Sequence, residues 1–77
     1  MKKYMVALAY SRGRFNELYY KKSNTIEELK QEVREFIEEN EVLSSEWEGG
    51  QVYNLANKEL VGIIAYNGKY FNKEDAK

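Results

Sequence analysis

The first 22 residues alternate in a way that predicts two strands joined by a tight turn. Between Lys3 and Tyr10, both sets of alternate positions are apolar or aromatic, which is typical of a central strand covered on both faces. The polar segment from Ser11 to Arg14 contains Gly13, which can adopt positive φ, and therefore predicts a hairpin turn. A second strand is expected from Phe15 to Lys22.

The turn sets the register expected between these two strands. If Arg12 and Gly13 form a two-residue loop, the residues that face each other across the hairpin are fixed. This register brings apolar and aromatic side chains together: Tyr10 with Phe15, Val6 with Tyr19, and Met5 with Tyr20.

Residues 25–39 carry the pattern of an amphipathic helix. Thr25 can cap its start, and Glu28, three residues later, completes a capping box. Asn40 is expected to end the helix in the left-handed conformation, with Val42 and Leu43 folding back onto the last turn. The apolar positions recur at helical spacing and form one stripe: Ile26, Leu29, Val33, Phe36 and Ile37.

The second half of the chain predicts a loop and three strands. The segment Ser44–Gly50 reads as a loop because it is polar and ends in two glycines. Strands are expected at Gln51–Leu55 and Glu59–Tyr66. The pair Asn67-Gly68 is a strong hairpin signal, which would return the chain along residues Lys69–Asn72.

These elements give the order ββαβββ and the α+β class, with one amphipathic helix packed on an antiparallel sheet. A chain of 77 residues provides one core, so we expect a single domain over residues 1–72 and a disordered polar tail over residues 73–77. One helix can cover only one face of the sheet, whereas Lys3–Tyr10 is apolar on both faces. An uncovered apolar patch, and hence a candidate interface, is expected on the other face.

The residue types present exclude most enzyme chemistry. The chain has no histidine and no cysteine, so its serine and threonine hydroxyls lack the usual base that activates a nucleophile. No phosphate-binding loop, dinucleotide motif, zinc-ligand set or calcium-loop spacing occurs. We therefore expect no enzyme activity, no catalytic residue, no cofactor and no metal. The apolar runs are much shorter than the ~20 residues that span a bilayer, so no membrane partner is expected.

Charge is distributed unevenly along the chain, although the net charge is only −1. Residues 1–22 carry a net +5, residues 23–50 a net −7, and the remainder a net +1. One end of such a molecule could meet phosphates and the other a basic partner. The two ends could equally attract each other within the fold.

The acidic helix face is the main candidate for a binding surface. At spacings of four, three and four residues, four glutamates fall on one side: Glu28, Glu32, Glu35 and Glu39. Like charges at this spacing mildly destabilise a helix, so local stability does not explain them. We expect a non-enzymatic module that binds a host protein with a basic surface. Trp47 would be a nearby aromatic anchor for this partner. In one form of this hypothesis, the row of carboxylates imitates the phosphates of a nucleic-acid backbone. The alternatives stay open that this face only keeps the domain soluble and that Trp47 fills the core.

The first hairpin supports a second hypothesis. Arg12 and Arg14 flank its turn, near Tyr10 and Tyr19, and proteins that bind single-stranded nucleic acid combine basic and aromatic side chains in this way. The acidic overall balance makes nucleic acid the less favoured partner, and the tyrosines could instead be sheet core. A third hypothesis is a structural homo-oligomer, such as a dimer, because a chain this small has little core and exposed edge strands.

In size, composition and expected topology, the chain resembles the small accessory proteins of phages and prophages in AT-rich bacteria. Frequent Lys, Asn, Tyr, Ile and Phe, with no Pro or His, carry the compositional part of this resemblance. The resemblance implies a cytoplasmic protein that binds a host protein and redirects or inhibits it.

Overall fold

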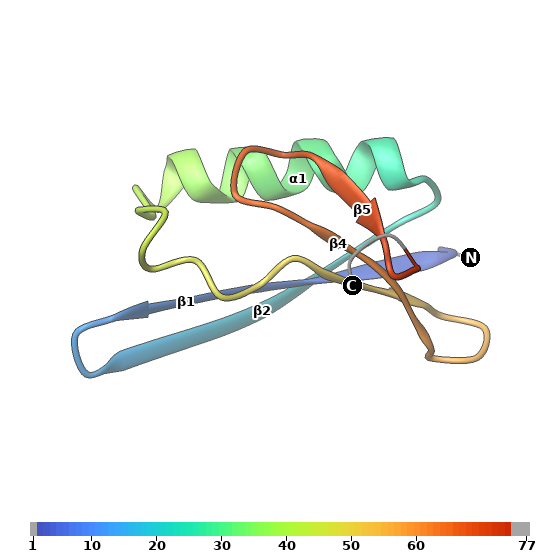
Figure 1. Ribbon diagram of the computed structural model, residues 1–77, viewed down its shortest axis with the longest axis horizontal. Helices are drawn as coiled ribbons and strands as arrows, with labels where there is room; N and C mark the ends of the chain where they lie inside the picture. The colour runs from blue at the N-terminus through green and yellow to red at the C-terminus, as the bar shows by residue number, and fades with distance from the viewer. Residues whose placement is uncertain (1, 75–77) are drawn as a thin grey trace.

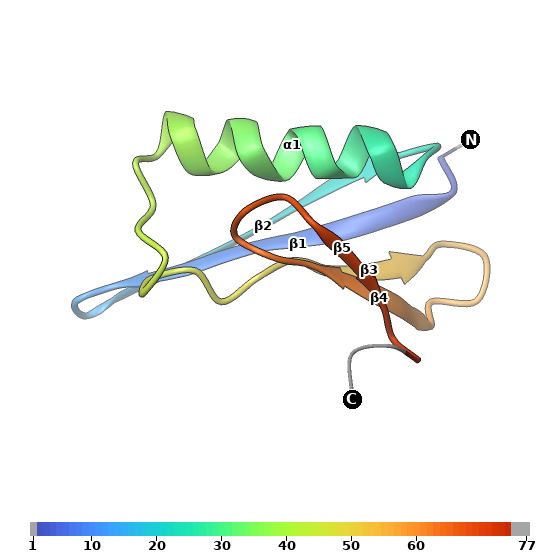
Figure 2. The same ribbon diagram turned by 45° about the horizontal axis from the view of Figure 1, so that its top comes forward.

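The computed structural model describes residues 2–74 and shows one helix on one face of a five-stranded sheet (Figure 1, Figure 2). All neighbouring strands are antiparallel, and their order across the sheet is β2-β1-β3-β4-β5. The predicted α+β class and the element order are confirmed. The elements are β1 (Tyr4–Arg12), β2 (Phe15–Ser23), α1 (Ile26–Glu39), β3 (Gln51–Asn54), β4 (Leu60–Ile64) and β5 (Tyr70–Asn72).

The helix begins where the capping residues predict. Thr25 is the N-cap of α1, and its hydroxyl oxygen accepts a hydrogen bond from the Glu28 N–H at 3.2 Å. The same hydroxyl donates to the Glu28 carboxylate at 3.1 Å. This carboxylate also lies in the first turn, where the helix dipole favours negative charge. The local sequence therefore determines the start of α1.

The end of the helix differs from the expectation in one respect. Asn40 has φ −100° and is not left-handed; the next residue, Glu41, takes positive φ at 50°. The N–H of Glu41 donates to the Glu38 carbonyl, and the N–H of Val42 donates to the Ile37 carbonyl. This pair of bonds is the Schellman arrangement, which needs its left-handed residue one position later than we expected. As predicted, Val42 is buried beneath the last turn, whereas Leu43 is exposed.

The core lies between α1 and one face of the sheet, and the strand residues that form it come from β1, β3 and β4. The alternation of a strand sends Val6 and Leu8 toward the helix, where both are fully buried. Of the predicted helical stripe, three residues are buried and two are half-buried. The buried apolar cluster consists of Val6, Leu8, Leu29, Val33, Ile37, Val42, Val52 and Ile64.

The register of the first hairpin corrects our expectation. The two loop residues are Gly13 and Arg14, so Arg12 pairs with Phe15 and every predicted partner is displaced by two residues. Gly13 has φ +62°, whereas Arg14 is not among the residues with positive φ. A type II′ turn requires positive φ at its first central residue, and an Arg12-Gly13 loop would impose it on arginine. Because the displacement is even, each side chain stays on the predicted face.

The segment Ser44–Gly50 is a loop, as expected, and its second half pairs with β1. The N–H of Glu48 donates to the Ala9 carbonyl and the N–H of Gly50 to the Ala7 carbonyl, so the segment runs beside β1. Trp47 forms a bridge with Tyr10 in this stretch. Alternation of apolar and polar residues is weak here, so the pairing with β1 has no local signal in the sequence.

The C-terminal hairpin forms at Asn67-Gly68, as predicted. The N–H of Gly68 donates to the Ala65 carbonyl, and the Asn67 side chain accepts from the Lys69 N–H. Of the tail expected at residues 73–77, residues 75–77 lie outside the described residues. The N–H of Lys73 donates to the Val61 carbonyl.

Candidate interaction surfaces

Three of the four predicted glutamates meet beside strand β2. Glu32, Glu35 and Glu39 line a shallow groove between α1 and β2, together with Lys21 and Phe36. The Lys21 ammonium lies 3.9 Å from the Glu32 carboxylate, which connects the helix to the strand. The groove thus combines three carboxylates, one ammonium and one aromatic ring, and we refer to it as the acidic groove.

The fourth glutamate has a different environment. The carboxylate of Glu28 accepts the hydrogen bond from the Thr25 hydroxyl and belongs to the start of the helix. Helical spacing puts Glu28 on the same flank as Glu32, but its carboxylate does not line the groove. Glu28 therefore contributes to helix stability as well as to the acidic flank.

The opposite flank of α1 carries the two basic residues of the helix. Lys30 lies 3.3 Å from Glu27, and Arg34 lies 3.7 Å from Glu38. Arg34 also donates to the Tyr66 carbonyl at 2.6 Å, which places it against the turn between β4 and β5. The two basic side chains of α1 are therefore directed away from β2, and the acidic groove keeps a net negative charge.

Trp47 packs against the core. Its ring centroid lies 6.4 Å from that of Phe36, in a cluster that also includes Tyr10 and Tyr19. The indole N–H is buried and has no hydrogen-bond partner among the described residues. Phe36 borders the acidic groove, so Trp47 supports that surface from below.

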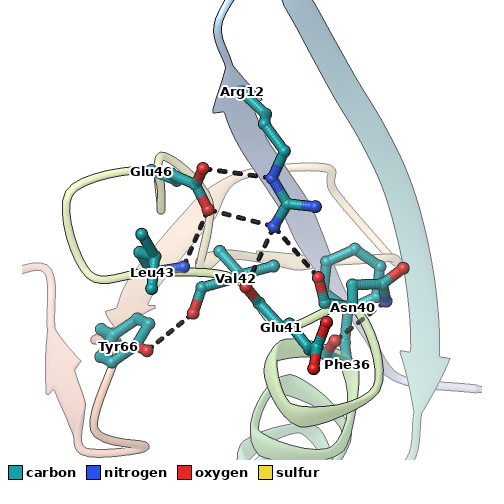
Figure 3. A network of polar contacts seen from close by, with 8 residues as sticks. All are labelled: Arg12, Phe36, Asn40, Glu41, Val42, Leu43, Glu46 and Tyr66. Atoms are coloured by element: carbon teal, nitrogen blue, oxygen red, sulfur yellow. Dashed lines mark hydrogen bonds and ion pairs between the residues drawn. The ribbon is translucent and has the colours of Figure 1, made fainter.

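Arg12 lies in a polar network rather than on a free surface (Figure 3). Its guanidinium donates to both carboxylate oxygens of Glu46 at 3.1 Å, and to the carbonyls of Asn40 and Glu41 at 3.1 and 3.0 Å. The last turn of α1 contains no basic residue, so Arg12 supplies the cation that helix C-termini favour.

The same network shifts two pKa values. The hydrogen bond from Arg12, followed by one from the Leu43 N–H, lowers the pKa of the Glu46 carboxyl from its ordinary value. The bond to Glu46 in turn raises the pKa of Arg12. Both groups are therefore held in their charged forms.

Arg12 also contacts another residue of the predicted nucleic-acid site, because its guanidinium carbon lies 5.3 Å from the ring centroid of Tyr10. Arg14 is exposed at the turn. Tyr10 and Tyr19 face the helix, with ring centroids 5.8 and 5.7 Å from that of Phe36. The Tyr19 hydroxyl donates to the Glu17 carboxylate at 2.9 Å, and this bond raises the pKa of Tyr19.

The face of the sheet opposite α1 is uncovered by the described residues and partly apolar, which confirms the predicted patch. Leu18 and Tyr20 are 56% and 52% exposed, and Phe71 is 43% exposed. A hollow of about 370 Å³ lies on this face. Its lining combines apolar, aromatic and basic side chains: Met5, Tyr20, Lys22, Tyr53, Asn54, Leu55 and Lys58.

Sequence reasoning located the patch but missed the hollow. Tyr20 and Tyr53 come from strands that are separated along the chain and joined in the sheet through β1. The sequence signal for the patch was the apolar character of both faces of the first strand. The pairing of β3 with β1, which brings Tyr53 beside Met5, has no local signature.

Within residues 2–74, no group of three or more acidic side chains is arranged to hold a metal ion. The 14-residue helix α1 is too short and too polar to cross a membrane, and no other helix occurs in this part of the chain. Comparisons of the chain with protein-family models, with curated proteins and with solved structures found no match. We therefore infer function from the surfaces of the protein.

Proposed function

We propose that this protein is a non-enzymatic module that binds a partner protein with a basic surface, and that the acidic groove is the binding surface. The observation that carries the proposal is that Glu32, Glu35 and Glu39 line one groove containing a single basic residue. Repulsion among these carboxylates weakens the helix, and a basic partner would relieve it. Complementary charge of this kind speeds association and discriminates among partners.

The proposal includes a biological setting, a phage- or prophage-encoded inhibitor that acts on a host protein in the cytoplasm. Composition and size support this setting. Imitation of a nucleic-acid backbone would require an unbroken row of free carboxylates. Because Glu28 is bonded to Thr25 and Glu32 is paired with Lys21, we favour recognition of a basic protein surface over such imitation.

Capture of partners from a bacterial lysate tests the proposal. The groove variant changes Glu32, Glu35 and Glu39 to Gln, and leaves Glu28 intact because it stabilises the helix start. The control variant changes Glu27, Glu38 and Glu59 to Gln, which removes the same charge away from the groove. We expect wild type and control to retain the same partners and the groove variant to lose them. Equal capture by all three proteins would contradict the proposal.

The hollow on the open face favours a second candidate function, the binding of single-stranded nucleic acid. Tyr20 and Tyr53 offer rings on which bases could stack, and Lys22 and Lys58 could neutralise phosphates. We favour this surface over the set Arg12, Arg14, Tyr10 and Tyr19, because Arg12 is bonded to Glu46, and Tyr10 and Tyr19 pack against Phe36.

Titration of labelled oligonucleotides at low salt tests this second function. Lys22→Gln with Lys58→Gln should weaken binding and reduce its salt dependence, whereas Lys2→Gln with Lys69→Gln serves as a control of equal charge. Absence of binding by the wild type at micromolar concentration and low salt would remove this candidate.

A further inference from the structure

Strand β2 forms a free edge of the sheet. It runs from Phe15 to Ser23, pairs with β1 on one side, and has no strand beyond it among the described residues. A nine-residue edge is long for a small domain, and a long exposed edge is a template for pairing with another chain.

The hydrogen-bond pattern shows which residues of this edge are available. The carbonyls of Ala7 and Ala9 accept from the segment on the far side of β1, so these residues direct their backbone groups away from β2. Their partners across the hairpin, Tyr20 and Leu18, must then direct their own backbone groups outward. The residues whose backbone groups point outward are Asn16, Leu18, Tyr20 and Lys22. Beyond the pairing of β2 with β1, their backbone N–H groups have no hydrogen-bond partner within residues 2–74.

The acidic groove lies along this same edge. Lys21 of β2 and Glu32 of α1 both line it, and Glu35 and Glu39 continue it along the helix. The intervening residues of β2 face the helix, as the contact of Tyr19 with Phe36 shows. A strand added beside β2 would therefore place every second side chain next to the carboxylates.

We infer that the partner presents a basic, extended segment that adds to β2 as a sixth strand of the sheet. The unpaired N–H and C=O groups of β2 hold its backbone, and its basic side chains, two residues apart, reach the acidic groove. This inference depends on the proposed function, because it describes how the partner occupies the same groove. It specifies the partner chemistry as alternating basic residues in an extended strand.

Charge selects such a segment over a second copy of this chain. Two β2 strands paired around Tyr19 would place Glu17 opposite Lys21, which is favourable by itself. The same pairing would bring two acidic grooves together, with three carboxylates and one lysine in each copy. A basic segment supplies the opposite charge that a second copy lacks.

A nine-residue peptide that alternates lysine with threonine or valine is a direct probe. Two versions carry N-methyl groups, one on the lysines and the other on the threonines and valines, so that composition and charge are matched. An added strand uses the N–H groups of alternate residues only. One methylated set should weaken binding about tenfold or more and the other should have little effect. The identity of the weakened set gives the orientation of the strand.

Amide hydrogen exchange locates the bound peptide on this protein. The N–H groups of Leu18 and Tyr20 should exchange more slowly in the complex. Leu18→Pro removes one outward N–H without removing a bond to β1, and should weaken binding while the protein stays folded. Failure of the unmethylated peptide to bind at low salt, or equal effects of the two methylated sets, would overturn the inference.

The outcomes separate this inference from the proposed function. If the groove variant loses its lysate partners while Leu18→Pro retains them, strand addition is wrong and the acidic groove remains the binding surface. If the peptide protects Leu18 and Tyr20 equally well in wild type and groove variant, the edge binds without the carboxylates, and the proposed role of the groove is wrong.

Discussion

Arg12 joins the turn of the first hairpin to the end of α1 and to the segment that follows it (Figure 3). At residue scale this is the clearest case of one side chain serving several elements. Its guanidinium donates to the carbonyl of Asn40, the C-cap of the helix, and to that of Glu41, the next residue, and Glu46 fixes its orientation. The side chain that sequence reasoning assigned to nucleic acid thus has a structural role.

Replacement of Glu46 with Gln should make stability less dependent on pH. Because the Glu46 pKa is lowered in the fold, its carboxylate stabilises the protein above the ordinary glutamate pKa, and this contribution is lost as the pH falls through the lowered value. Glu46→Gln should therefore be less stable than wild type at neutral pH, and the difference should disappear in acid. Urea unfolding followed by the fluorescence of Trp47 measures it, with Glu59→Gln as control.

Gly50 should be the least replaceable glycine. Its N–H donates to Ala7 and its carbonyl accepts from Ile64, with φ at +97°, and an added Cβ would overlap the Ile64 carbonyl. Gly50→Ala should destabilise the fold by about 3 kcal/mol or more. Gly13→Ala is the comparison, because its Cβ would meet nothing within 4 Å, and only its positive φ should cost about 1 kcal/mol. Similar unfolding midpoints for the two variants would contradict this ranking.

The difference between Thr25 and Arg12 shows what could be predicted from the sequence at this scale. Thr25 and its partner Glu28 are three residues apart, so the capping pattern was visible in the sequence. The partners of Arg12 are 28 to 34 residues away, and only the fold brings them together. A site residue whose function depends on such distant partners has no local signal.

At the scale of elements, the end of α1 contains an avoidable strain. Glu41 adopts φ 50° in a position that usually holds glycine, next to a last turn without basic residues. Glu41→Gly should raise the free energy of unfolding by about 1 kcal/mol, because the left-handed conformation costs that much for a residue with a Cβ. Glu41→Ala removes the charge but keeps the Cβ, and should not reproduce the gain. Thermal unfolding of the three proteins measures it; an equal gain in Glu41→Ala would assign the effect to charge.

The elements themselves were largely predictable, and the exceptions have physical causes. Periodicity and capping identified the five strands and the helix of residues 2–74 because these signals are local. The hairpin register was displaced by two residues because the position of Gly13 within the turn depends on the turn type. The segment Ser44–Gly50 is a loop, as predicted, but its bonds to Ala7 and Ala9 have no local signal because these partners are distant in the sequence.

At the scale of the whole molecule, helix α1 divides the surface into two regions of different chemistry. One is the acidic groove beside β2, and the other is the open face with its tyrosines and lysines. The acidic stripe and the uncovered patch were both predictable, the first from helical spacing and the second from a strand apolar on both sides. Their relation to the free edge of β2 was not, because it requires the order of strands in the sheet.

The carboxylates of the acidic groove should also prevent self-association. A free edge with exposed Leu18 and Tyr20 would otherwise pair with its own copy, and groove repulsion opposes that pairing. Sedimentation velocity at rising concentration should show wild type and the Glu27, Glu38, Glu59 control as monomers, and the groove variant as a dimer. Addition of Leu18→Pro to the groove variant should restore the monomer, because proline blocks the edge. A groove variant that stays monomeric would show that charge repulsion does not prevent pairing of the β2 edge. A dimeric wild type would show that a second copy of this chain binds the β2 edge.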